Sequence, residues 1–302
     1  MICRVAFATL RLLATACGCS LALAAQRPSS LPVAVTNNAV ASGRIDGAWW
    51  IFSALGIDTS KRWSGITTRA VAWNSRDAGW RQLPDVPGDR GRLAATAQVV
   101  RGRLFVIGGY TVDSAGREHS VPQVNIYDVV HDRWSAAAPI PVPGVFGHSG
   151  ALAGNTILFI DGALKQPAGA KYRLAGQSWI GTIDPRDPRV IAWRAAPPHP
   201  GPPLYRAAAG ACGSRILIAG GTANPYNYDG IGYDGAPSAP RADVMVFDTR
   251  RGTWSSSRPL RVASMDHRAL AVLGDSAYIV GGMQQAQVVG NAVTAAAYGG
   301  CD

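Results

Sequence analysis

A block of roughly 50 residues recurs along this chain, and the repetition constrains the fold more than any other feature. The clearest copy starts at Gly91 with a run of small residues. After a turn it continues with an apolar stretch that ends in the pair Gly108-Gly109, and the alternating residues 123–128 and the segment around Trp134 complete it. The second glycines of such pairs, or their equivalents, lie at positions 56, 109, 162, 221 and 282. Because glycine pair, Asp-turn-Trp and Pro recur together at similar offsets, the chain is built from structural repeats.

This period, with four strands in each repeat, is typical of the kelch-type β-propeller. The innermost strand of a blade is crowded and takes small residues, while the second is buried on both faces and apolar. The sequence therefore predicts an all-β fold with five recognisable four-stranded blades, and the irregular residues 163–192 leave room for a degenerate sixth. The last repeat stops after its third strand, at residues 291–298. We expect residues 31–36 to supply its missing outer strand, closing the ring and removing an exposed edge.

The first 25 residues have the features of a secretory signal. Arg4 and Arg11 provide positive charge, residues 12–23 are apolar but too short to span a bilayer comfortably, and Ala22-Leu23-Ala24 forms a small-x-small cleavage site. We therefore expect a signal peptide over residues 1–25, a single propeller domain over residues 26–302, and a periplasmic or secreted protein. No later segment is long and apolar enough to be a membrane helix.

The five cysteines bear on the same compartment. Cys17 and Cys19 leave lipid attachment open as an alternative fate of the leader. Cleavage would leave Cys212 and Cys301, and an oxidising compartment would let them pair. Cys212 ends an inner strand and Cys301 follows a third strand, and such strands in neighbouring blades usually lie beyond the bridging limit of about 7 Å between Cα atoms. The sequence therefore predicts two free thiols.

The formal net charge of +10 comes from 29 basic residues, of which 26 are arginine. These arginines are scattered, with no run longer than two, whereas nucleic-acid-binding surfaces cluster their basic residues. We therefore expect no nucleic-acid partner. The excess positive charge favours an acidic ligand.

Propellers bind ligands around the central channel, on the face formed by the starts of the inner strands and by the loops between second and third strands. His148 and His267 each start an inner strand and are the candidate acid–base residues. The candidate substrate-binding residues are Arg90, Arg92, Tyr205, Arg206, Arg268, Tyr226 and Tyr228. Arginine clamps carboxylates, and tyrosine offers a flat apolar face with a polar tip to a sugar ring.

Each candidate also has a structural interpretation. The arginines can pair with neighbouring aspartates, the histidines can be hydrogen-bonded core residues, and the tyrosines can cover the channel. No carboxylate or cysteine stands at ligand spacing from the histidines, so we expect neither a metal nor a cofactor.

Residues 30–162 resemble the N-acetylneuraminate epimerase (sialic acid mutarotase) family of secreted bacterial kelch propellers. The resemblance rests on Leu31-Pro32, residues 41–46, Gly88-Asp89-Arg90, residues 124–127 and residues 144–148. It implies an isomerase acting at the anomeric carbon of a free sugar acid, with Arg90 binding the carboxylate. Such a reaction needs a base for the anomeric hydroxyl and an acid for the ring oxygen.

The chain departs from that family in two respects. Family members usually have six blades, and they carry a glutamate directly after an Asn-Gly, whereas here Asp161-Gly162 is followed by Ala163. A more distant resemblance, confined to the propeller, links the chain to galactose oxidase. The copper site of that enzyme needs two His, two Tyr and a Cys, and here Cys212 and Cys301 lie in the wrong repeats for it.

Two functions therefore stay open. The first is a propeller that acts on or binds a small acidic sugar at the channel mouth, as a mutarotase or epimerase. The second is a non-catalytic kelch module that binds a glycan or a protein. A carboxylate and an imidazole converging on the channel would favour catalysis, whereas a mouth of arginine and tyrosine alone would favour binding.

Overall fold

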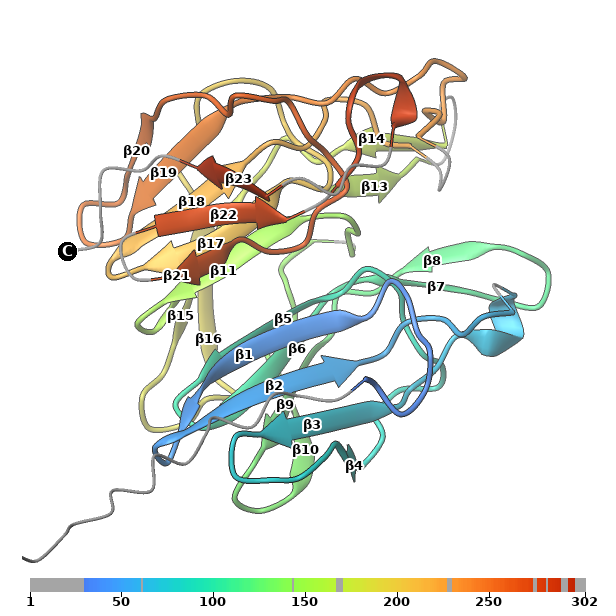
Figure 1. Ribbon diagram of the computed structural model, residues 1–302, viewed down its shortest axis with the longest axis vertical. Helices are drawn as coiled ribbons and strands as arrows, with labels where there is room; N and C mark the ends of the chain where they lie inside the picture. The colour runs from blue at the N-terminus through green and yellow to red at the C-terminus, as the bar shows by residue number, and fades with distance from the viewer. Residues whose placement is uncertain are drawn as a thin grey trace, which may run out of the picture.

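The computed structural model describes residues 30–60, 62–142, 144–166, 171–226, 230–273, 276–280, 282–288 and 293–296. Their strands form antiparallel sheets that are set as blades around a channel (Figure 1). The predicted all-β, kelch-type propeller is thus confirmed. In Figure 1 the first two blades form the lower half of the molecule, and the last two lie in the upper half.

Four blades have four strands each, and the chain runs outward from the inner strand of each. Blade 1 is β1 (Ala39–Ile45), β2 (Ala48–Ala54), β3 (Ala70–Asn74) and β4 (Arg81–Leu83). Blade 2 is β5 (Thr96–Val100), β6 (Arg103–Ile107), β9 (Val124–Asp128) and β10 (Arg133–Ala137). Blade 3 is β11 (Ser149–Ala153), β12 (Thr156–Ile160), β15 (Trp179–Ile183) and β16 (Ile191–Ala195). Blade 4 is β17 (Ala208–Cys212), β18 (Arg215–Ala219), β19 (Val244–Asp248) and β20 (Thr253–Ser256).

The fifth blade has three strands in the described residues, β21 (Ala271–Leu273), β22 (Ser276–Val280) and β23 (Val293–Ala296). The connections between second and third strands carry small elements of their own. These are η1 (Trp63–Gly65), the hairpins β7 (Tyr110–Val112)–β8 (Glu118–Ser120) and β13 (Ala163–Lys165)–β14 (Tyr172–Leu174), and η2 (Gln285–Gln287). The hairpin β13–β14 with β15 and β16 accounts for residues 163–192, so the described part of this stretch holds no sixth blade.

The repeated tryptophan ties each blade to the one before it. The indole Nε1 of Trp134 in β10 donates to the Pro84 carbonyl, 2.7 Å away, at the end of blade 1. Trp254 in β20 does the same with the Pro197 carbonyl at 3.0 Å, at the end of blade 3. Trp193 in β16 makes a longer bond, 3.4 Å, to the Ala138 carbonyl just before Pro139. In these three blades the Trp marker therefore bonds to the chain at or next to the Pro marker of the preceding blade, which packs the indole and satisfies its polar atom.

The crowding expected of the inner strands is visible at Gly210 in β17. A Cβ at this position would lie 2.9 Å from the Leu270 Cβ, so the approach of blades 4 and 5 needs a glycine there. The second strand of blade 4 is correspondingly apolar, and Ile216–Ala219 are fully buried.

The predicted closure by residues 31–36 is wrong in the described part of the chain. Thr36 exchanges both backbone hydrogen bonds with Ile57, at 3.0 and 2.9 Å. Leu93, Phe146, Tyr205 and Met265 make the same isolated bridge in the other blades. Thr36 therefore belongs to blade 1 as a regular part of its repeat, and only two residues separate it from β1, too few to reach an outer blade edge about three strand spacings away.

In place of a shared sheet, a side-chain contact links the first and last blades. The Arg268 guanidinium, at the start of blade 5, donates to the Asn37 side-chain oxygen at 3.0 Å. In the described residues β23 pairs with β22 alone; residues 291, 292, 297 and 298 lie outside them.

The prediction of two free thiols is also wrong. Cys212 is buried at the end of β17 and is disulfide-bonded. It lies at the end of β17, next to the Gly213 turn, so the distance between the inner and third strands of neighbouring blades does not limit its reach. Cys301 and the cysteines of the leader lie outside the described residues.

Reduction is therefore expected to destabilise the protein, because a native crosslink typically contributes about 2–4 kcal/mol. The melting temperature should fall in dithiothreitol, and Cys212→Ser should melt at the same lowered temperature with or without reductant. A wild-type melting temperature that ignores the reductant would contradict this expectation.

Among the described residues, no helix is long and apolar enough to cross a membrane.

Candidate functional site

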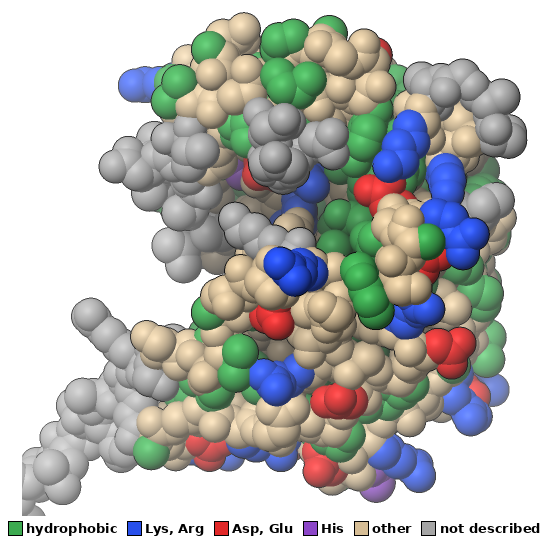
Figure 2. All heavy atoms as spheres, turned by 90° about the vertical axis from the view of Figure 1, so that its right-hand side faces the viewer, with side chains coloured by type: hydrophobic (Ala, Val, Ile, Leu, Met, Phe, Trp, Pro, Cys, Tyr) green, Lys and Arg blue, Asp and Glu red, His purple; other side chains and the backbone are tan. Residues whose placement is uncertain are grey.

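The inner strands of all five blades line a cavity of about 1340 Å³. Its walls are mostly small and apolar, while charged and aromatic side chains gather at one end. Figure 2 faces the side of the molecule that carries η1 and the two hairpins, and shows it hollowed between its upper and lower halves, with Lys and Arg side chains at the rim. We call this end the channel mouth; its residues are Asn37, Trp63, Tyr110, Glu118, Arg206, Tyr226, Tyr233, Asp266 and Arg268.

A repeated backbone conformation aims side chains into the mouth. Directly after each bridge residue, one residue per blade has a positive φ: Asn37, Ala94, Gly147, Arg206 and Asp266. This conformation is unfavourable for a long side chain such as that of Arg206, with φ of 53°. Hydrogen bonds hold it in place, since the Arg206 N–H donates to Gly147 and its carbonyl accepts from His267. Strain of this kind, fixed by its surroundings, is common at functional sites.

Two guanidiniums share one carboxylate at the mouth. Arg206 Nη1 lies 2.7 Å from Asp266 Oδ1, and Arg268 Nη1 lies 3.9 Å from the same atom. Arg206 is buried, and the Nε atoms of both arginines are buried without a hydrogen-bond partner. Counted over the described residues, the cluster therefore carries one positive charge in excess, and its two Nε–H groups donate to no acceptor.

The pKa values follow from this crowding. Burial and repulsion from Arg206 lower the pKa of Arg268. Burial alone would lower the pKa of Arg206, but attraction to Tyr205 and Asp266 outweighs it and raises this pKa. Burial alone would raise the pKa of Asp266, but attraction to Arg206 and Arg268 outweighs it and lowers this pKa. The aspartate therefore remains ionised, and the two arginines compete for it.

Tyrosines surround the arginine pair. The Arg206 guanidinium carbon lies 5.0 Å from the ring centre of Tyr226 and 5.1 Å from that of Tyr205. Burial raises the pKa of Tyr110 to about 12, and it raises those of Tyr226 and Tyr233 as well, so these phenols stay neutral hydrogen-bonding groups. The mouth thus combines a cationic pair with aromatic walls.

Glu118, at the start of β8, is the single glutamate of the chain and lines the same cavity. Its carboxylate pairs with Lys171 at 2.6 Å and accepts a hydrogen bond from the Tyr172 hydroxyl. The Lys171 ammonium also lies 5.6 Å from the ring centre of Tyr233. These contacts join the hairpins of blades 2 and 3 to the long loop of blade 4 and form one rim of the mouth.

Three of the predicted substrate-binding residues do meet at the cavity, namely Arg206, Arg268 and Tyr226. Tyr205 is fully buried behind them, 5.2 Å from Tyr226 between ring centres. Tyr228 lies outside the described residues.

The remaining predicted arginines lie elsewhere. Arg92 is buried within blade 2, where it donates to the Gly108 carbonyl and to the Asn125 side chain at 3.1 and 2.6 Å. Arg90 is exposed and lines a separate cavity beside blade 1.

The two predicted acid–base histidines lie behind the channel wall, and neither lines the cavity. His148 Nε2 is 2.8 Å from the Thr96 hydroxyl, and His267 Nε2 is 2.9 Å from the Ser264 hydroxyl. Burial lowers their pKa values to about 3 and about 4, so both are neutral at pH 7. Each directly follows the positive-φ residue of its blade.

Asp266, Glu118, Tyr110 and Tyr233 lie at strand starts and in loops that the sequence predicts on this face, although they were not among the candidate acid–base or binding residues. Gln98 was missed as well. Its side-chain amide is buried in the inner strand β5, lines the cavity and has no hydrogen-bond partner. Two signals in the sequence could have indicated these residues. Gln98 stands among small and β-branched residues, and Glu118 is the single glutamate of the chain.

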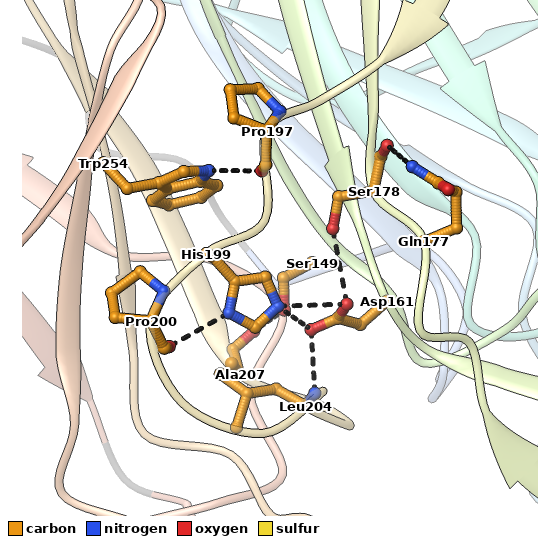
Figure 3. A network of polar contacts seen from close by, with 10 residues as sticks. All are labelled: Ser149, Asp161, Gln177, Ser178, Pro197, His199, Pro200, Leu204, Ala207 and Trp254. Atoms are coloured by element: carbon orange, nitrogen blue, oxygen red, sulfur yellow. Dashed lines mark hydrogen bonds and ion pairs between the residues drawn. The ribbon is translucent and has the colours of Figure 1, made fainter.

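A second buried polar cluster lies between blades 3 and 4, away from the cavity (Figure 3). Asp161 accepts hydrogen bonds from the Leu204 N–H at 2.8 Å and from the Ser178 hydroxyl at 3.3 Å, and His199 Nε2 lies 3.0 Å from its carboxylate. The carboxylate sits between serine and imidazole, which is not the order needed to activate a serine nucleophile. Across the described residues, no three His, Cys, Asp or Glu side chains gather as metal ligands would.

No family model matches the sequence. The chain is 31% identical to human Kelch-like protein 34 over 162 residues, which is 52% of this chain and 22% of that protein. It is 24% identical to Kelch-like protein terF of Aspergillus terreus over 210 residues, which is 68% of this chain and 42% of that protein. The matches therefore span less than half the length of either relative.

Among solved structures, the fold is similar to the structure of YjhT. The TM-score is 0.52 with 14% sequence identity, over 89% of this chain and 96% of that one. Together these similarities support the kelch β-propeller. The finer resemblance to the N-acetylneuraminate epimerase family stays a prediction.

Proposed function

We propose that this protein is a periplasmic or secreted kelch propeller that binds a small acidic sugar at its channel mouth. The observation that carries the proposal is the arginine pair, in which two guanidiniums share the single carboxylate of Asp266. An excess positive charge beside the buried Arg206 is costly unless an anion joins it. A ligand carboxylate would supply that charge and accept hydrogen bonds from the guanidinium groups of Arg206 and Arg268, which line the cavity.

The rest of the mouth supports a sugar as the carrier of that carboxylate. Tyr226, Tyr110 and Tyr233 offer flat apolar faces with neutral hydroxyls, which suit a ring whose faces are apolar and whose edges are polar. Deeper in the channel, Gln98 adds a polar side chain to the lining.

The geometry favours binding over catalysis by the two histidines, because neither imidazole reaches the cavity. Isomerisation stays a second candidate function on one specific observation: Glu118 lines the same cavity as the arginine pair, where a base could act on a bound sugar. Proton NMR of freshly dissolved N-acetylneuraminic acid tests it. Faster anomer exchange with the protein than with a Glu118→Gln variant would support the isomerase.

The binding proposal is tested by calorimetry with N-acetylneuraminic acid and with neutral N-acetylmannosamine. Arg268→Gln should weaken binding of the acid by about tenfold to a hundredfold, since a charge-assisted hydrogen bond contributes about 1.5–3 kcal/mol. Asp266→Asn should strengthen it, because the competing carboxylate is gone. Arg251→Gln, which changes an exposed arginine of a remote turn, serves as the control. Equal affinities for the two sugars, or none for either, would remove the acidic-sugar proposal and favour a protein-binding propeller.

A further inference from the structure

A second cavity, of about 780 Å³, lies beside the channel mouth. It is formed by residues 31–35, the loop 63–69 and residues 89–91, and we call it the side groove. Three residues, Trp63, Ile66 and Val112, line both this groove and the channel cavity. The two spaces are therefore neighbours that share one wall.

Trp63 is the prominent residue of that shared wall. It begins η1, in the connection between β2 and β3, and it is 48% exposed. Backbone hydrogen bonds on both sides, from Gly65 to Arg62 and from Asp58 to Gly65, fix the short turn that carries it. An exposed indole on a fixed turn between two cavities offers a stacking surface to a sugar ring.

The side groove carries no net formal charge, but it offers two arginines to a ligand. Arg69 and Arg90 are exposed there, and no ion pair engages either of them within the part of the chain that the structure describes. The groove also contains two carboxylates. One of them, that of Asp58, accepts from the Ser60 hydroxyl and N–H, and these hydrogen bonds lower its pKa. Two arginines thus remain free to meet acidic groups of a ligand.

The volumes of the channel cavity and the side groove suit a ligand larger than one monosaccharide. Sites for single small molecules usually measure about 300–1,000 Å³. The channel cavity alone exceeds this range, and the side groove adds a space of comparable size. One monosaccharide at the arginine pair would leave most of this lined volume empty.

We propose that the channel mouth and the side groove together hold an acidic oligosaccharide. One acidic unit binds at Arg206 and Arg268, the next ring stacks on Trp63, and a further acidic unit lies along the groove toward Arg90 and Arg69. This inference rests on the proposed function and specifies the ligand as a short chain of acidic sugars.

Calorimetry with N-acetylneuraminic acid and its α2,8-linked trimer tests the inference. We expect the wild-type protein to bind the trimer about tenfold or more tightly than the monomer. Trp63→Ala should weaken trimer binding by about tenfold and monomer binding by less, so that the ratio of the two affinities falls. Arg90→Ala, outside the channel mouth, should weaken only the trimer.

Two matched controls separate local effects from general ones. Trp49 is 56% exposed on β2 and lines neither cavity, so Trp49→Ala should leave both affinities unchanged. Arg133 is exposed on β10, so Arg133→Ala is the matched control for Arg90→Ala and should also leave both affinities unchanged.

The outcomes distinguish this inference from the function on which it rests. Monomer and trimer affinities that are equal, and equally reduced by Arg268→Gln, would overturn the oligosaccharide and leave the acidic-sugar site standing. Trimer binding that Trp63→Ala and Trp49→Ala weaken to the same extent would also overturn it. Absence of binding by both sugars would overturn the site and the inference together.

Discussion

Replacing His199 with alanine is expected to lower the free energy of unfolding by about 3–5 kcal/mol at pH 6, because removing one partner of a buried ion pair leaves the other charge uncompensated. Asp161, the partner, is 1% exposed. Its remaining contacts, to the Leu204 N–H and the Ser178 hydroxyl, solvate the carboxylate but do not neutralise it. The imidazole also packs against Trp254, whose indole bonds to the Pro197 carbonyl at the end of blade 3 (Figure 3). The substitution thus loosens the joint between blades 3 and 4.

The pH dependence of this effect identifies its cause. Burial tends to lower the pKa of His199, but the hydrogen bond and charge of Asp161, with the Pro200 carbonyl, outweigh it and raise the pKa above 6.5. The proton therefore binds the folded state more tightly. The stabilisation is complete below pH 6.5 and is lost as the pH rises through the raised pKa of the folded protein.

Urea titrations at pH 6 and pH 9 test both the size of the loss in unfolding free energy and its dependence on pH. The difference between wild type and His199→Ala should be largest at pH 6 and smaller at pH 9. His131→Ala is the control, since His131 is a solvated turn residue paired with Asp128 and should cost less than about 0.5 kcal/mol. A His199→Ala protein that loses less than about 1 kcal/mol at pH 6 would contradict the buried ion pair.

Most of the architecture could be predicted because its causes are local and repeated. Strand positions follow from apolar and small-residue runs, and the Trp and Pro markers turned out to be joined by hydrogen bonds such as that of Trp134 to Pro84. Closure could not be predicted in the same way. Thr36 stands where Leu93 and Tyr205 stand in their own blades, but the similarity of these bridge residues lies in backbone pairing and leaves no mark on their side chains.

The candidate residues were expected on the face where the structure has the channel mouth, but only Arg206, Arg268 and Tyr226 of them line the cavity. The position that lines the cavity differs between blades. Arg206 and Asp266 line it at the positive-φ position, and Asn38 and Ala95 line it one residue later, whereas His148 and His267 at that later position do not. In blade 3 the positive-φ position is Gly147, where a side chain would collide with the Tyr205 ring. Blade 3 therefore contributes no side chain to the channel mouth at that position.

Acidification from pH 6.5 to pH 5 is expected to destabilise the protein through those two histidines. Their pKa values are lowered by burial from 6.5 to about 3 for His148 and about 4 for His267. Between pH 6.5 and pH 5 the two imidazoles therefore bind protons in the unfolded chain but not in the folded protein. Their contribution to stability is complete above pH 6.5 and is lost progressively as the pH falls toward the lowered pKa values.

The expected loss is about 2 kcal/mol for each imidazole at pH 5, since each pH unit in this interval corresponds to about 1.36 kcal/mol. Carboxylates with ordinary pKa values remain ionised in this range. The stabilising contribution of His199 is close to its maximum below pH 6.5, so it adds little to the slope. Unfolding free energies measured every half pH unit should fall less steeply for His148→Gln than for wild type, even if this variant is less stable at pH 7. The slope is the informative quantity, because a lost packing contact against Phe159 lowers stability equally at every pH, whereas a lost titration changes only its dependence on pH. Parallel curves for the two proteins would show that His148 is not held neutral by burial.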